Sequence, residues 1–167
     1  MDEHVQTIEK VIDELESSNK QRLNPSKVIR PDVPDEDPDR TLNKNDFVPV
    51  GSGEDREVYE LPDKKHVVKI GLSDQEQNMK EVERWMKAEE NSDINESNAL
   101  APIVRYDDSY KWIISKKVDP IGLTDDGWTQ IDEQTDYNVL EELGIQDLET
   151  LEFGWYEEQI VAYDYGQ

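Results

Sequence analysis

The sequence predicts an α+β domain over residues 47–167, built from a twisted antiparallel sheet and one long helix, with a much reduced helical part toward the C-terminus. Three apolar runs, Phe47–Val50, Val58–Leu61 and His66–Ile70, are separated by Gly and Pro turns, which is typical of short strands. A charged stretch from about residue 74 to 90 follows them, with apolar residues at helical spacing. These observations together give the fold class.

The charge of the chain restricts its partners. At 167 residues the chain is expected to form one domain, and its 41 acidic and 18 basic residues give a formal net charge of −23. Such a field repels nucleic acid and anionic membranes, so we expect neither as a partner through phosphate contacts. It suits a protein that stays soluble in concentrated salt, where its self-repulsion is screened. A DNA-mimicking decoy or an acidic interaction surface would also account for it.

The residue inventory excludes several kinds of site. The chain has no cysteine and only two histidines, which argues against disulfides and against a zinc centre. We see no signal peptide and no apolar run long enough to span a membrane. The expected location is therefore the cytoplasm of a host that contains high salt, or the inside of a packaged particle.

The first 46 residues form a separate unit in this prediction. Residues 4–22 favour an amphipathic helix, because apolar residues recur there at helical spacing: Val5, Ile8, Ile12 and Leu15. Residues 24–46 carry four prolines among charged residues, which predicts an extended arm. The helix is expected to pack on the domain or on a partner protein. The acidic run in the arm could bind a metal, but such loops are usually only solvated.

The strands and the long helix are expected to share a core. Val58 and Glu60 alternate with Tyr59, as residues on opposite faces of a sheet do. Ser73 and Glu76 form a capping box, so the helix should begin near Asp74. Its apolar face would hold Met79, Val82 and Met86, while Glu81 and Glu83 are candidates for reaching toward the sheet.

The remaining segments are shorter. A polar loop at 91–98 precedes two strands, Pro102–Tyr106 and Lys111–Lys116, which are expected to form a hairpin around Asp107-Asp108. Val118–Asp126 is expected to be a polar connection. A short helix is expected from the spacing of three apolar residues and from the glycine that ends it: Tyr137, Leu140, Leu143 and Gly144.

The chain closes on a strand, Gln159–Tyr163, which delivers Asp164-Tyr165-Gly166. From Val118 to Gln167 there is no Lys or Arg. The C-terminal part therefore has no basic side chain with which to hold a phosphate or an acidic substrate.

A phosphate site is suggested by the Gly51-Ser52-Gly53 turn between the first two strands. Glycines allow backbone N–H groups to approach a phosphate closely, and Lys69 on the third strand could add a positive charge. Most Gly-x-Gly turns bind nothing, however. When the residues are considered alone, the default expectation is that Lys69 is an exposed lysine on an edge strand.

The order of these segments resembles the protein-kinase-like fold, and in particular the short kinase-like proteins of bacteriophages and haloarchaeal viruses. The resemblance covers about residues 47–167 and implies a kinase-like N-lobe. It also implies that Lys69 points inward and pairs with a carboxylate, for which Glu81 or Asp164 could serve. Since only Gln167 follows Gly166, we expect neither the activation loop nor the peptide-binding helical lobe of that family.

The resemblance assigns ATP-binding roles to residues of the first part. The Gly51, Ser52 and Gly53 turn would contact phosphates, although Arg56 stands where the third glycine belongs, as in the short phage-type relatives. Val58 would pack on the base. Lys69 would bind the α- and β-phosphates and be oriented by Glu81, with Glu83 as the alternative.

The match in the C-terminal part implies a catalytic base and a magnesium site. Asp147 takes the place of the base, although Gln146 and Ile145 replace the usual arginine and histidine before it. Asp164 in Asp-Tyr-Gly corresponds to the residue that ligates magnesium. Glu152 stands where the metal-ligating asparagine belongs, and a carboxylate can serve that purpose.

Two functional hypotheses follow. The first is a kinase-fold protein of a halophilic system that has lost full catalysis and acts as a binding or structural module, for example as a component of a virus particle. The missing substrate lobe and the acidic C-terminal part favour it. The alternative is a minimal Mg-ATP-dependent phosphotransferase that uses Lys69, Asp147 and Asp164, which the retained lysine and Asp-Tyr-Gly favour.

Overall fold

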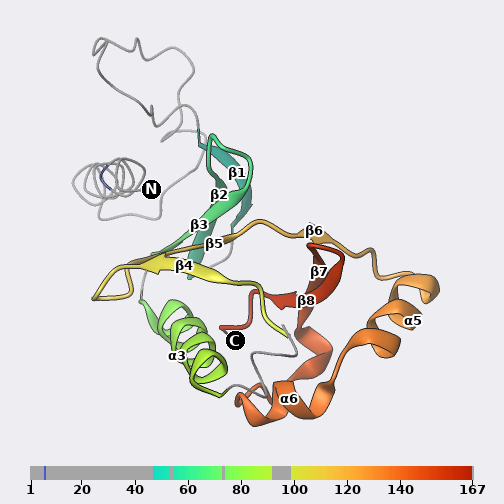
Figure 1. The fold of residues 1–167 in the computed structure, drawn as a ribbon. Coiled ribbons are helices and arrows are strands. Elements are labelled where there is room, and N and C mark those ends of the chain that lie inside the picture. Colours follow the sequence, from blue (N-terminus) through green and yellow to red (C-terminus); the bar gives the residue numbers. More distant parts are fainter. Residues whose placement is uncertain (1–5, 7–46, 53–54, 73, 92–98, 167) are drawn as a thin grey trace.

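A computed structural model describes residue 6 and residues 47–52, 55–72, 74–91 and 99–166. These residues form an α+β fold of two antiparallel sheets and three α-helices (Figure 1). The predicted fold class is therefore confirmed at the level of an antiparallel sheet with helices. The expected helix over 4–22 and the arm up to residue 46 lie outside the described residues, apart from Gln6, which is helical.

The larger sheet has five strands in the order β1-β2-β3-β5-β4, with every neighbouring pair antiparallel. The strands are β1 (Val48–Ser52), β2 (Arg56–Glu60), β3 (His66–Gly71), β4 (Ile103–Tyr106) and β5 (Trp112–Lys116). All five were predicted, with ends that differ by a few residues. The expected turn between β4 and β5 is also present, where the Asp107 carboxylate accepts hydrogen bonds from the backbone of Ser109 and Lys111.

The two faces of this sheet have different surroundings, as the alternation of residues predicts. One face carries a buried apolar cluster formed by Phe47, Tyr59, Leu61, Val68, Ile70, Trp112 and Ile114. Val58 and Lys69, which are register partners on β2 and β3, lie on the other face. That face is turned toward the helices and the smaller sheet.

Helix α3 (Glu76–Glu90) packs against β3, β4 and β5 and buries Val82, Glu81 and Asn78 against them. Its cap residue is Gln75, and the Asp74 carboxylate accepts a hydrogen bond from the Glu76 N–H at 3.0 Å. The helix thus begins two residues later than predicted. Ser73 of the expected capping box, and residues 92–98 of the expected polar loop, lie outside the described residues.

The C-terminal part contains more strand than the sequence predicted. A three-stranded sheet joins β6 (Asp119–Pro120), β7 (Glu152–Tyr156) and β8 (Gln159–Tyr163), and only β8 was expected. The prediction of a polar connection over Val118–Asp126 was wrong, because β6 and the start of α5 (Asp125–Gln134) lie there. The Thr124 hydroxyl caps the start of α5, because it accepts a hydrogen bond from the Gly127 N–H at 3.2 Å, and this bond stabilises the first turn of the helix.

Helix α6 (Tyr137–Glu142) confirms the predicted short helix. Gly144 adopts φ 87°, the left-handed conformation that glycine takes without steric cost, and thereby ends the helical run. A 3₁₀ turn, η2 (Leu148–Thr150), then leads directly into β7. The segment expected to resemble a catalytic loop is therefore a turn followed by a strand.

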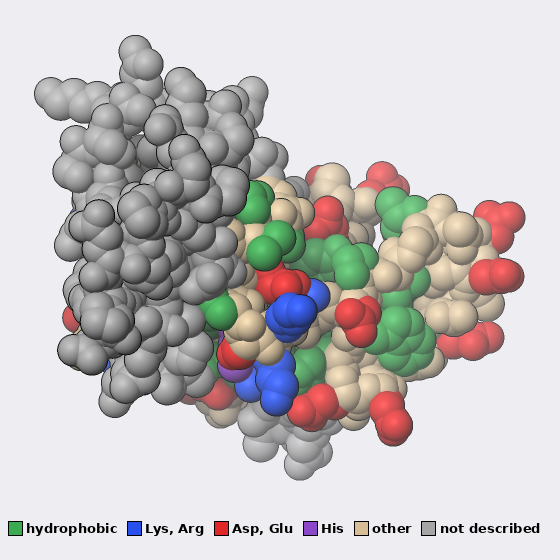
Figure 2. Space-filling view, turned by 90° about the horizontal axis from the view of Figure 1, so that it is seen from above, with side chains coloured by type: hydrophobic (Ala, Val, Ile, Leu, Met, Phe, Trp, Pro, Cys, Tyr) green, Lys and Arg blue, Asp and Glu red, His purple; other side chains and the backbone are tan. Residues whose placement is uncertain are grey.

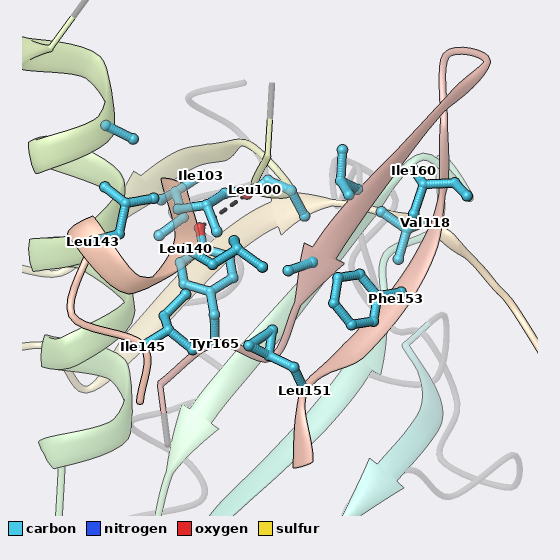
Figure 3. Packing of buried hydrophobic residues seen from close by; sticks show 14 of the residues in the cluster. Leu100, Ile103, Val118, Leu140, Leu143, Ile145, Leu151, Phe153, Ile160 and Tyr165 are labelled. Carbon is cyan, nitrogen blue, oxygen red and sulfur yellow. Dashed lines mark hydrogen bonds between the residues drawn. The ribbon is translucent and has the colours of Figure 1, made fainter. Parts of the chain in front are cut away.

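One apolar cluster connects the three α-helices, strands β4 and β5, and the smaller sheet. Helix α6 contributes Leu140 and its C-terminal end contributes Leu143, the smaller sheet contributes Phe153 and Val161, and Ile113 comes from β5. Figure 3 shows the ring of Tyr165 among these side chains, below Leu140 and beside Ile145. Backbone hydrogen bonds between Ala101 and Ala162 and between Ala162 and Ala99, both 2.8 Å long, join the approach to β4 to the smaller sheet. This cluster therefore lies between the larger and the smaller sheet, while the cluster around Tyr59 and Val68 is on the other face of the larger sheet.

No helix in the described part of the chain has the length and apolar content that crossing a membrane requires. This finding agrees with the absence of an apolar run in the sequence.

Candidate functional site

A buried ion pair between β3 and α3 is the centre of the candidate site. The Lys69 ammonium donates to both carboxylate oxygens of Glu81, at 2.8 and 2.9 Å. Both residues are buried, and Glu81 has no exposed surface at all. The expected inward ion pair is present, and Glu81 is the partner, since Glu83 is exposed to solvent.

The environment shifts the pKa values of both partners. Burial lowers the pKa of Lys69 from 10.5 to about 8; the Glu81 carboxylate opposes this change and the charge of Arg56 adds to it. Burial alone would raise the pKa of Glu81. The Lys69 and Arg56 charges outweigh that effect, so this pKa lies below its ordinary value of 4.5. Glu81 is therefore held as a carboxylate, whereas Lys69 can lose its proton in mildly alkaline solution.

A second buried cation, Arg56, completes the cluster. Its guanidinium donates to a Glu81 carboxylate oxygen at 3.0 Å and to the Asn78 side-chain carbonyl at 3.3 Å, and it also contacts the Asp164 carboxylate. The Asn78 amide in turn donates to the Tyr110 carbonyl at 2.9 Å. Strand β2, helix α3 and the C-terminal turn are thus joined through one guanidinium.

The Asp164-Tyr165-Gly166 turn lies against α3. Asp164 adopts φ 57°, and its carboxylate lies 3.7 Å from the Lys69 ammonium. A Cβ atom at Gly166 would come within 2.2 Å of the Gln77 carbonyl oxygen, so only glycine permits this close approach. The Tyr165 hydroxyl donates to the Ala101 carbonyl at 2.9 Å, a bond drawn as a dashed line in Figure 3. The turn is therefore fixed both in the core and on the helix.

A cavity of about 630 Å³ opens beside this cluster. Its apolar lining comes from strands of both sheets and from the segment between them, and includes Val50, Val58, Val67, Val118 and Pro120. Four basic and four acidic side chains also line it, namely Arg56, Lys69, Lys116 and Lys117 with Asp55, Glu60, Glu152 and Asp164. In a chain with 41 acidic and 18 basic residues, this equal balance gives the cavity a larger share of basic side chains than the chain as a whole.

Basic side chains are unevenly spread over the surface as well. Figure 2 shows Lys and Arg side chains close together near the middle of one face, beside hydrophobic side chains, with many acidic side chains toward its edge. The negative charge of the chain is therefore not uniform over its described surface.

Most of the predicted site residues come together at the cavity. Gly51, Val58, Lys69, Glu152 and Asp164 line it, and Glu81 lies directly behind Lys69. A Cβ atom at Gly51 would meet nothing within 4 Å, so the packing of the chain itself does not require glycine there.

The structure bears differently on the other predicted residues. The backbone of Ser52 pairs with Glu57 at the end of β1, and Gly53 lies outside the described residues. Asp147 is exposed at the start of η2 and is absent from the cavity lining. The residue expected to act as a base is therefore not found among the groups that surround the cavity.

Sequence reasoning missed the part that Arg56 and Asn78 play. Arg56, Val58 and Glu60 share one face of β2 because residues two apart in a strand point the same way. This alternation could have placed Arg56 beside Lys69. Asn78 lies three residues before Glu81, hence on the same helix face, which is the corresponding signal on α3.

The carboxylates do not fit a magnesium ion as they are arranged. Asp164 is already paired with Arg56 and lies near Lys69, and Glu152 is its only predicted companion ligand. Among the residues that the structure describes, no three His, Cys, Asp or Glu side chains come together as a metal-binding group. A divalent cation at Asp164 would have to displace a guanidinium.

Comparisons with known proteins give no guide to this site. No protein-family model matches the chain, and neither the curated proteins nor the solved structures that were searched contain a match to it.

Proposed function

We propose that the chain is a nucleotide-binding module with a kinase-like fold that has lost full catalysis. The observation that carries this proposal is the Lys69–Glu81 ion pair at a cavity whose lining combines apolar side chains from both sheets with charged ones. A buried lysine held by a carboxylate beside such a cavity can bind a phosphate, while the apolar lining accepts a base.

The dimensions and composition of the cavity support a ligand of this class. Small-molecule sites commonly have volumes of roughly 300–1,000 Å³ and combine apolar lining with a few fixed polar groups. Val58 and Val67 lie on adjacent strands on the same side as Lys69 and offer apolar side chains to a base. Arg56 and Lys69 supply positive charge beside it.

Loss of catalysis is supported by the position of Asp147. A general base must come within hydrogen-bond reach of the proton it removes. Asp147 is exposed and does not line the cavity, and the Asp164 carboxylate is paired with two cations. The alternative, a phosphotransferase that uses Asp147, lacks this geometric support.

Nucleotide binding is tested directly by calorimetric titration of ATP in concentrated KCl, where the negative charge of the chain is screened. We expect saturable binding to the unaltered protein and an affinity at least tenfold lower for Lys69→Met. The matched control is Lys65→Met, which removes an exposed lysine from the β2–β3 turn and should leave the affinity unchanged. Absence of binding, or equal affinity for both variants and the unaltered protein, would refute the proposal.

The affinity should also depend on pH through Lys69. Since the pKa of Lys69 is about 8, the ammonium is present below that pH and is lost as the pH rises through it. Nucleotide phosphates are already ionised in this range, so affinity is expected to fall up to about 30-fold between about pH 7 and about pH 9.5. Titrations across this range measure the effect. The Lys69→Met variant should show a flat profile; if its profile matches that of the unaltered protein, another group is responsible.

A further inference from the structure

Arg56 is the second buried cation of the candidate site. Only 5% of the residue is exposed, yet it lines the cavity. Its guanidinium contacts Asp164, which is the carboxylate that the resemblance to kinases assigns to magnesium. The position that a metal ion would need is thus taken by a positive side chain.

The charges around Arg56 balance without any added ion. Two cations, Arg56 and Lys69, contact two carboxylates, Glu81 and Asp164, and all four groups lie within one connected network. A divalent ion at Asp164 would meet two like charges in a poorly hydrated setting, where repulsion is stronger than in water. The network therefore disfavours a metal ion at this carboxylate.

A guanidinium can also perform the part of the metal toward a ligand. Arginine presents several N–H donors in a planar fork that matches the oxygens of a phosphate, and it stays charged at every accessible pH. Arg56 is held in place by Glu81, Asn78 and Asp164, so it presents fixed positive charge at the cavity wall without further ordering.

We propose that Arg56 replaces a divalent cation in this site, so that the phosphates of a nucleotide are bound without metal. This inference rests on the proposed nucleotide-binding function. It goes further by stating that the ligand is the metal-free nucleotide and by assigning Arg56 as the residue that makes the metal unnecessary.

The first experiment compares ATP binding with EDTA and with excess Mg²⁺, again by calorimetry in concentrated KCl. We expect the two affinities of the unaltered protein to agree within about twofold, since no step of binding requires the ion. An affinity at least tenfold lower in EDTA would overturn the inference while leaving the proposed function intact. If ATP binds under neither condition, the proposed function fails and the ligand part of this inference fails with it.

The second experiment keeps the assignment of Arg56 testable whether or not ATP binds. Mg²⁺ alone is titrated into the unaltered protein, Arg56→Gln and the double variant Arg56→Gln/Asp164→Asn. We expect saturable Mg²⁺ binding only in Arg56→Gln, where Asp164 is released from the guanidinium and can act with Glu152, and its loss in the double variant. Binding of Mg²⁺ at Asp164 in the unaltered protein, seen as heat that Asp164→Asn abolishes, would overturn the inference, and so would absence of binding in a folded Arg56→Gln.

Thermal unfolding establishes that the variants are folded before either titration. If Arg56→Gln does not fold, Arg56→Lys serves in its place, because a lysine keeps the charge but loses the fork of donors. It is expected to retain metal-independent ATP binding with a several-fold lower affinity. An unchanged affinity in Arg56→Lys would refute contact between the guanidinium fork and phosphate, and a requirement of this variant for Mg²⁺ would show that charge alone does not replace the ion.

Discussion

Replacement of Glu81 by glutamine is expected to lower the free energy of unfolding by about 3–5 kcal/mol, which is the usual cost of removing one partner from a buried ion pair. Glu81 has no exposed surface and accepts hydrogen bonds from both Lys69 and Arg56. Without its charge the two cations would share only Asp164. Since a domain of this size has a stability of about 5–15 kcal/mol, much of its folding free energy depends on one carboxylate. Chemical unfolding in concentrated KCl measures the change.

The chain offers two matched controls for this measurement. Glu83→Gln makes the same chemical change two residues away on the exposed side of α3 and should alter stability by no more than about 0.5 kcal/mol. Lys69→Met should cost less than Glu81→Gln, because Glu81 would keep Arg56 as a partner. If Glu83→Gln proved as costly as Glu81→Gln, a general loss of acidic charge would be responsible and the ion-pair argument would fail.

The difference in free energy of unfolding between the unaltered protein and Glu81→Gln should depend on pH, which provides a check within the same experiment. The folded-state pKa of Glu81 lies below 4.5, so its contribution to stability is complete above that pH and disappears as the pH falls through the folded-state value. The gap between the unaltered protein and Glu81→Gln should therefore narrow in acid, at a pH below 4.5. A gap that stays constant down to pH values where other carboxylates titrate would mean that the substitution perturbs packing rather than charge.

The strands could be predicted because their signals are local, whereas the inward position of Lys69 was expected only from the resemblance to the kinase-like fold. Period-two alternation around Tyr59 and Val68 fixes which residues share a face, and Lys69 falls on the face opposite to these two buried side chains. Once a lysine lies on a covered face, it needs a carboxylate, and the helix that follows supplies one. The Asp164-Tyr165-Gly166 turn also has a local signal, since it follows the apolar strand Gln159–Tyr163 directly.

The elements that were missed depend on contacts far apart in the sequence. Strand β7 contains aromatic residues that favour strands, but Glu152 and Gly154 interrupt them, and the strand is completed by its pairing with β6 and β8. The position of Asp147 at the start of η2 depends on the same pairing, which a short sequence motif does not report. Arg56 was passed over since an arginine in a strand is ordinarily exposed, and only the meeting of β2, α3 and the C-terminal turn makes its burial possible.

Tyr165→Ala is expected to have the other large effect, a loss of about 3–5 kcal/mol in the free energy of unfolding, as for other buried aromatic side chains. The side chain is 2% exposed and packs in the cluster that joins both sheets to α6. Burial raises the pKa of its phenol well above 10.0, so the hydroxyl remains a donor to Ala101 from acid to mildly alkaline pH. Tyr165→Phe keeps the ring and removes only this hydrogen bond, and it should cost about 1 kcal/mol.

The effect of Tyr165 substitutions on ATP affinity distinguishes the packing of the ring in the core from its effect on the position of the C-terminal turn. Tyr165 does not line the cavity, but it follows Asp164, whose left-handed backbone conformation must be maintained by the surrounding packing. Loss of the ring should release Asp164 from Lys69 and Arg56. Because Asp164 is one of the groups that hold Arg56 in place, ATP affinity should then fall in Tyr165→Ala and be retained in Tyr165→Phe. Unfolding curves and ATP titrations of both variants provide the comparison. If Tyr165→Ala destabilises the protein yet leaves both ATP affinity and the response to Mg²⁺ unchanged, the C-terminal turn contributes to the core alone, and Asp164 has no part in the site.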